Sequence, residues 1–234
     1  MTAVGYRVWP EIPHPEKDDA LVIWNRNKSS DKIARRFEAV GARVFVAENG
    51  YLGKGWLGAK WYAISENHHN GAGRWVYGGP QRWDGFGIEL SPWRDGNEVL
   101  ILEQRGIGEP GIASPPGWAE KTQKRLGGRI RRHPGNGGEP LKPEDLKNVR
   151  CVVTWGSSAA LKSLLWGVPV FYEMPKWIGA SAAKHISEWG EPRRDDSRLE
   201  MFRRLAWAMW ELEEIRKGIP FEGARLLPRA GQDS

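Results

Sequence analysis

The stretch that decides the fold is Val153-Thr-Trp-Gly-Ser-Ser-Ala-Ala-Leu161. In it a short apolar strand ends, a glycine makes the turn, and two serines, Ser157 and Ser158, open a helix. Free N–H groups and a partial positive charge at a helix start favour anions, and two added hydroxyls suit a diphosphate. A helix cap would account for Ser157 alone, but not for a serine pair at the sheet edge where α/β proteins bind ligands.

Strands and helices alternate on both sides of this turn. The pattern predicts strands over residues 98–102, 129–132, 150–154 and 168–172, and helices over 118–126, 143–146, 157–166 and 197–217. Nearer the N-terminus it predicts a strand over 20–24, a helix after Ser29 that Gly41 ends, and a strand over 42–47. Strand–helix–strand units imply parallel pairing.

Residues 48–96 break this alternation, with one short strand expected at 60–64. We therefore predict an α/β protein with two Rossmann-like lobes and a cleft between them. The boundary is expected near residues 92–97. It divides the chain into residues 1–95, an acceptor-binding lobe, and residues 96–234, a nucleotide-sugar-binding lobe with a C-terminal helix.

Polar side chains also follow the other strands of the second predicted lobe. Arg131 and His133 end one strand, and Gln104 and Arg105 end another. Because parallel strands finish at one edge of a sheet, we expect these groups near Ser157. Arginine can bind phosphate through two hydrogen bonds, and histidine can donate one. A solvated basic loop is the alternative interpretation.

Candidate catalytic groups lie in the first predicted lobe. Glu48 directly follows a strand and could accept a proton from an acceptor hydroxyl. His69 and Asp84 add polar groups to the irregular segment. Adjacent His68 and His69 lack the spacing of a zinc pair, so no metal site is predicted. A plain surface loop is the alternative for both histidines.

Composition narrows the class of protein. The 234 residues carry a net charge of +6 and include 14 tryptophans, a balance that suits polyanions or phosphate-bearing ligands. No apolar run is long enough for a membrane span, and no secretory signal is evident, so a cytoplasmic location and no membrane partner are expected. The single cysteine, Cys151, lies within an apolar strand, and a phosphate-binding P-loop motif is absent.

An ordered set of motifs resembles the C-terminal lobe of capsular-polysaccharide-type glycosyltransferases. The set is Arg131-Arg-His-Pro134, then Ser157-Ser158, then Gly167-Val-Pro-Val170, and Glu48-Asn-Gly-Tyr-Leu52 is similar to a step in the family's first lobe. The resemblance implies a GT-B-like fold and a metal-independent transferase without a bound cofactor. It further implies a nucleotide sugar, expected to be a UDP-sugar, whose phosphates are held by Arg131, His133, Ser157 and Ser158.

The chain is shorter than that family, and its compact form resembles proteins of tailed phages. This resemblance implies transfer of a sugar to hydroxymethylated pyrimidines of phage DNA, in the cytoplasm of an infected bacterial host. Basic residues and tryptophans alternate in the irregular segment and could contact DNA. The candidates are Lys54, Lys60, Arg74, Arg82 and Trp83. A glycan or lipid acceptor, or a non-catalytic nucleotide- or DNA-binding phage protein, are the alternatives.

Overall fold

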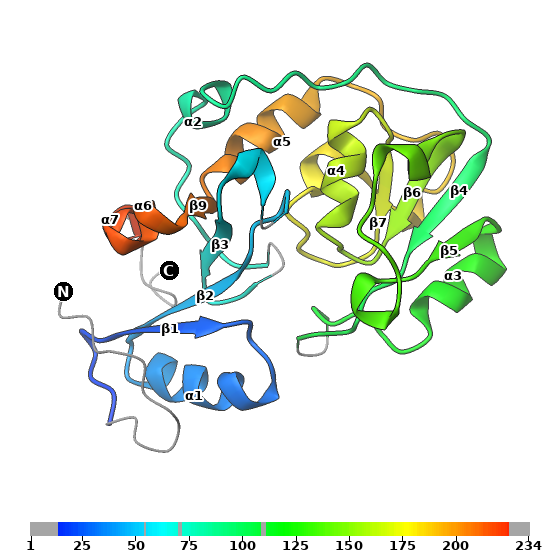
Figure 1. The fold of residues 1–234 in the computed structure, drawn as a ribbon. Coiled ribbons are helices and arrows are strands. Elements are labelled where there is room, and N and C mark those ends of the chain that lie inside the picture. Colours follow the sequence, from blue (N-terminus) through cyan, green and yellow to red (C-terminus); the bar gives the residue numbers. More distant parts are fainter. Residues whose placement is uncertain (1–13, 54, 70–71, 109–110, 225–234) are drawn as a thin grey trace.

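The structure, a computed structural model, describes residues 14–53, 55–69, 72–108 and 111–224. It is a mixed α/β protein with one four-stranded and one five-stranded sheet. Figure 1 shows the four-stranded sheet on the left, with β1 to β3 in blue and cyan and β9 in orange, and the five-stranded sheet on the right, mainly in green and yellow. The predicted mixed α/β class with parallel strands is therefore confirmed.

The four-stranded sheet contains three N-terminal strands and one C-terminal strand. In spatial order they are β1 (Ala20–Trp24), β2 (Arg43–Asn49), β3 (Trp61–Glu66) and β9 (Met209–Glu211). β1 and β2 are parallel and are joined by α1 (Lys28–Ala39), whereas β2–β3 and β3–β9 are antiparallel. The Asn27 side chain caps α1 by accepting hydrogen bonds from two backbone N–H groups. The parallel pairing of β1 with β2 on either side of α1 confirms the predicted strand–helix–strand unit.

The five-stranded sheet is entirely parallel. Its order is β5 (Arg129–Arg131), β4 (Glu98–Leu102), β6 (Val149–Thr154), β7 (Val170–Tyr172) and β8 (Lys184–His185). The helices α3 (Trp118–Leu126) and α4 (Ala159–Leu165) connect its strands. The predicted strands are confirmed within two residues, and β8 is an additional strand that the sequence pattern did not indicate.

The predicted long helix over residues 197–217 is wrong. The chain forms α5 (Ser197–Ala206), then strand β9, then α6 (Leu212–Arg216) and α7 (Ile219–Ala224). Arg82 accounts for the break, because its guanidinium donates to the backbone carbonyls of Ala206 and Met209, which are then not used within a continuous helix. β9 instead completes the edge of β3, with Trp210 opposite Tyr62.

This return of the chain links the segments on either side of residue 95. The C-terminal segment belongs partly to the sheet built by the first 66 residues, so a single cut does not separate the two sheets. The segment between them holds the short helix α2 (Gln81–Asp84), and after a turn at residues 85–87 the chain crosses the top of the molecule in Figure 1, without helix or strand, to reach β4.

Short 3-10 turns complete the chain. They are η1 (Trp56–Gly58), η2 (Pro134–Asn136), η3 (Pro143–Leu146), η4 (Ala180–Ala182) and η5 (Ile186–Glu188). The predicted helix over 143–146 is therefore one 3-10 turn.

One hydrophobic core joins the two sheets. Trp61 and Ala63 of β3 belong to the same buried cluster as Val152 of β6 and Leu161 of α4. The opposite face of β3 packs separately, where Ile64 contacts Phe45 and Trp210. The four-stranded sheet thus has one face directed towards the five-stranded sheet and one directed away from it.

Candidate functional site

The turn that follows β6 is tied to the loop that follows β4. The backbone N–H of Gly156 donates to Oε1 of Gln104 at 2.8 Å. β4 and β6 are neighbours and run parallel, so both loops leave the same carboxyl edge of the five-stranded sheet. Gln104 therefore lies where the sequence pattern places it, and its contact with a ligand stays a prediction.

The two serines of this turn have different environments. The Ser157 N–H donates to Oγ1 of buried Thr154 at 2.9 Å, and Oγ of Ser157 accepts from the Ala159 N–H at 3.2 Å. Ser157 thus closes the turn as a structural cap, and α4 begins at Ala159 rather than at Ser157. Ser158 is half-buried, and its hydroxyl forms no hydrogen bond with the described residues, which makes Ser158 the better candidate for a ligand contact.

The turn after β5 determines which ring nitrogen of His133 can donate a hydrogen bond. Its N–H donates to Glu103 at 2.9 Å, and Nδ1 accepts from the Gly135 N–H at 2.9 Å. Burial, followed by the nearby Arg105 guanidinium, lowers the pKa of His133, while Glu103 opposes the shift. The neutral ring must therefore carry its proton on Nε2, so it can donate one hydrogen bond to an anion at neutral pH.

Arg131 and Arg105, both predicted at this edge, differ in whether the guanidinium group is available to a ligand. Arg131 is directed away from the edge, because its guanidinium donates to the Pro140 carbonyl at 2.9 Å and to Asp145 at 3.1 Å. Arg105 is exposed and lies across Gly135, where an added Cβ would come within 2.5 Å of its Cδ. Arg105 therefore lies at the open edge, whereas the position of Arg131 does not support its expected phosphate contact.

Glu48 lies within β2 rather than after it. It is directly opposite Ala63, and side chains opposite each other in antiparallel strands share a face. Ala63 belongs to the core that joins the two sheets. Half-buried Glu48 is therefore on the face of the four-stranded sheet that is directed towards the five-stranded sheet.

His69 lies in the loop that follows β3 and is buried. Its Nδ1 accepts from the Arg26 N–H at 3.2 Å, and its ring stacks on His68 at 4.8 Å. Burial, followed by His68, lowers the pKa of His69 to about 4, against an opposing effect of the Ile107 backbone. Ile107 belongs to the loop after β4, so His69 lies where the two sheets meet.

Asp84 forms an ion pair within the fold. Both of its carboxylate oxygens accept from Arg203 of α5 at 3.0 Å. This ion pair connects α2 to α5, two helices that pack together. The expectation that Asp84 acts as a base is therefore not supported, because the carboxylate already neutralises a guanidinium.

Most of the predicted DNA-contacting residues that the structure describes are engaged within the fold. Trp83 is only 1% exposed and stacks on Phe202 at 4.8 Å. Arg82 binds Glu214 through two hydrogen bonds of 2.7 Å, and Arg74 forms an ion pair with buried Glu66 at 3.0 Å. Lys60 is exposed, and Lys54 lies outside the described residues. Three of the five candidates are thus structural.

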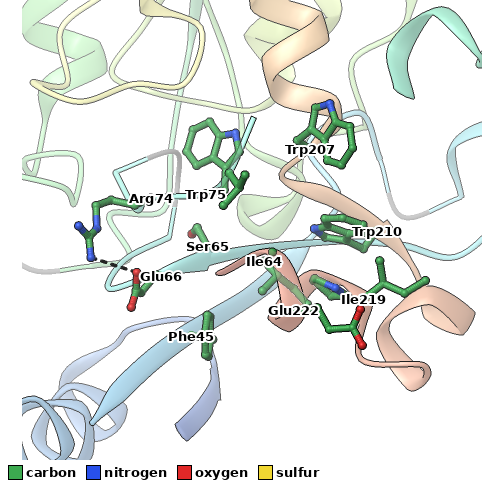
Figure 2. Close-up of a pocket in the computed structure, with 13 residues that line it drawn as sticks. Phe45, Ile64, Ser65, Glu66, Arg74, Trp75, Trp207, Trp210, Ile219 and Glu222 are labelled. Carbon is green, nitrogen blue, oxygen red and sulfur yellow. Dashed lines mark hydrogen bonds and ion pairs between the residues drawn. The ribbon is translucent and has the colours of Figure 1, made fainter. Parts of the chain in front are cut away.

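Two cavities were not foreseen from the sequence. One, of about 220 Å³, lies on the far face of the four-stranded sheet, where Trp75, Trp207 and Trp210 surround it (Figure 2). The indole N–H groups of Trp75 and Trp207 donate to backbone carbonyls, so these rings offer only apolar surface. The other cavity, of about 260 Å³, lies between the segment after β7 and α5, with Lys176 and Trp177 among its lining residues.

Metal and membrane chemistry find no support in the described part of the chain. Among those residues, no group of three histidine, cysteine or acidic side chains is arranged to hold a metal ion. No described helix has the length and apolar character that crossing a bilayer requires. Burial raises the pKa of Cys151 to about 11, which keeps this thiol protonated and unreactive near neutral pH.

Comparison with solved structures identifies proteins of similar fold. KpsC of Thermosulfurimonas dismutans, described as a beta Kdo 2,7 transferase, has a TM-score of 0.54 and 12% identity, over 89% of this chain and 85% of that one. The beta Kdo 2,4 transferase described for KpsC of the same organism has a TM-score of 0.49 and 13% identity, over 85% and 86% of the two chains. No protein-family model matches the sequence, and no curated protein matches it. At these identities the likeness concerns the fold alone.

Proposed function

We propose that this chain is a glycosyltransferase that binds the diphosphate of a nucleotide sugar at the carboxyl edge of the five-stranded sheet. The observation that carries the proposal is the set of hydrogen-bond donors at the ends of three neighbouring strands. Arg105 follows β4, His133 follows β5 and Ser158 follows β6. Parallel α/β sheets bind their ligands at this edge. The fold likeness to a sugar transferase supports the same reading.

The chemistry of these donors suits a leaving diphosphate. When the anomeric carbon leaves the donor, the bonding electrons pass to a phosphate oxygen, where negative charge develops. A guanidinium, the Nε2–H of neutral His133 and the Ser158 hydroxyl would each bind that charge. Gln104 holds the turns after β4 and β6 together through Gly156, so the donors are positioned before the ligand binds. We propose that no metal ion is needed.

Glu48 is the proposed base. It would remove the proton of the acceptor hydroxyl while the acceptor oxygen bonds to the anomeric carbon and the bond from that carbon to the diphosphate breaks. Its position on the face directed towards the five-stranded sheet supports this role. His69 is less suited, because a pKa of about 4 makes it a weak proton acceptor at neutral pH. A GT-B-like arrangement with the acceptor bound on the first-sheet side belongs to the same proposal.

The acceptor is proposed only as a hydroxyl compound. The expected DNA surface loses its support, because Arg74, Arg82 and Trp83 serve the fold. Hydroxymethylated pyrimidines in DNA therefore stay as one acceptor to be tested beside a glycan. DNA binding would separate the two, since contacts with phosphates weaken steeply as salt rises.

The test begins with the donor. UDP and a panel of nucleotide sugars are titrated into the protein, and transfer to hydroxymethylated duplex DNA or to an oligosaccharide is followed by mass spectrometry. We expect UDP binding, and a fall in turnover of about a hundredfold when His133→Ala and Ser158→Ala are combined. Lys124→Ala, on the exposed side of α3, is the control and should leave turnover unchanged. Normal turnover in the double variant would refute the site.

A further inference from the structure

Lys162 is half-buried and has no counter-charge among the residues that the structure describes. It lies in the middle of α4, and its ammonium forms no hydrogen bond or ion pair with the described residues. Burial alone lowers the pKa of this group, with no carboxylate acting to raise it. The lysines of α3, Lys121 and Lys124, are exposed to solvent instead. A cation withdrawn from water without a partner is costly, and a bound anion would offset that cost.

The position of the ammonium joins the two parts of the molecule. An added Cβ at Gly53 would lie 3.3 Å from Nζ of Lys162, so the side chain reaches from α4 to the turn that follows β2. Gly53 has a φ of +115°, a conformation that other residues rarely adopt, and a side chain there would crowd the ammonium. In Figure 1 α4 is the helix of the five-stranded sheet that lies beside the four-stranded sheet.

Helical geometry relates Lys162 to the candidate donor site. Lys162 follows Ser158 by four residues, so the two side chains lie on one face of the helix. Side chains on a helix lean towards its N-terminus, which directs the Lys162 stem back towards Ser158 and the carboxyl edge. The ammonium therefore approaches this edge from the side of Gly53, whereas Arg105 and His133 approach it from β4 and β5.

We propose that the Lys162 ammonium binds a phosphate oxygen of the nucleotide-sugar donor from the side of the four-stranded sheet, next to the Ser158 hydroxyl. This inference rests on the proposed donor site and adds a binding residue to it. The bound anion would supply the counter-charge that Lys162 lacks among the described residues. Because the Lys162 ammonium lies beside Gly53, donor binding would bring the turn after β2, which follows Glu48, near the reacting groups.

The experiment measures how fast each lysine of the full-length protein reacts with an amine-acylating reagent at pH 8, by peptide mass spectrometry. The reaction is run without ligand, with saturating UDP and with inorganic pyrophosphate. We expect UDP to slow acylation of Lys162 at least fivefold and to leave Lys124 unchanged. This readout uses the unaltered protein, so it does not depend on whether a variant folds.

Affinity for UDP provides the second readout. Lys162→Met should weaken UDP binding about tenfold, Lys162→Arg should recover part of the loss, and Lys124→Met should have no effect. The inference is overturned if UDP binds Lys162→Met with normal affinity and leaves acylation of Lys162 unchanged. If the unaltered protein binds neither UDP nor any other nucleotide sugar, the proposed function fails as well. The two failures are therefore distinguishable.

Discussion

The two sheets use the same kinds of polar side chain in opposite ways. Around the four-stranded sheet charged groups bind one another, as Arg82 does with Glu214 and Arg74 with Glu66. Arg105, at the carboxyl edge of the five-stranded sheet, and Lys162, in α4, have no carboxylate partner among the described residues. Residue type alone therefore does not identify a ligand site. Position at the end of a parallel strand, combined with the lack of an internal partner, is what favours Arg105 over Arg131 as a candidate ligand contact.

The largest expected effect tests whether Trp83 serves the fold rather than DNA binding. Trp83→Ala should reduce the free energy of unfolding by about 3–5 kcal/mol, because it removes a buried ring that stacks on Phe202. Guanidinium denaturation followed by tryptophan fluorescence measures this loss. Trp24→Ala is the matched control, since Trp24 is 49% exposed, and it should cost about 1 kcal/mol. A stable Trp83→Ala protein that has lost DNA affinity would restore the predicted stacking surface.

A second test measures how the free energy of unfolding depends on pH through His69, which lies at the junction of the two sheets. The pKa of His69 is about 4 in the folded protein and 6.5 as its ordinary value, so the unfolded chain binds the proton first. The contribution of His69 to stability is complete above pH 6.5 and is lost as the pH falls towards 4, by about 3 kcal/mol in total.

Chemical denaturation at a series of pH values measures this slope. His69→Gln should flatten it, leaving the smaller part that comes from His133, whose pKa is lowered in the same direction. An unchanged slope in His69→Gln would show that this ring is accessible to protons, and would return it to the list of candidate bases.

The smallest effects come from a crossed pair of arginine substitutions. Arg131→Ala should lower the free energy of unfolding by about 1–3 kcal/mol and leave UDP affinity unchanged, because it breaks contacts with Pro140 and Asp145. Arg105→Ala should weaken UDP binding about tenfold and change stability by less than about 0.5 kcal/mol. Calorimetric titration and denaturation of both variants test this. The reverse pattern would reinstate Arg131 as the phosphate contact.

Local pattern was sufficient to predict most of the five-stranded sheet. β4 and α3 have the predicted bounds, because an apolar run and an amphipathic helix depend on neighbouring residues. The prediction of one long C-terminal helix was wrong because the apolar spacing of this segment also fits a continuous helix. The contacts that break the helix come from residues distant in sequence. Arg82 and the edge of β3 lie more than 100 residues from Met209 and Trp210.

For the candidate residues, the sequence indicated where the strands end better than which contacts the side chains make. Parallel strands bring their ends together whatever the side chains do, so the meeting of Gln104 with the β6 turn could be foreseen. Which arginine stays available could not, because the ion pair of Arg131 with Asp145 depends on how the η3 turn packs. The ion pair of Asp84 with Arg203 could not be predicted for the same reason, because the two residues are 119 positions apart in the sequence.

The return of β9 to the first sheet restricts how this architecture can be recombined. A single crossover near residue 95 would give β3 of one parent a β9 from the other, and Tyr62 would face an unmatched partner in place of Trp210. A chain cut at the same point would leave the β3 edge unpaired, which favours aggregation. Exchange of either sheet between relatives therefore requires two crossovers, one before β4 and one between α5 and β9.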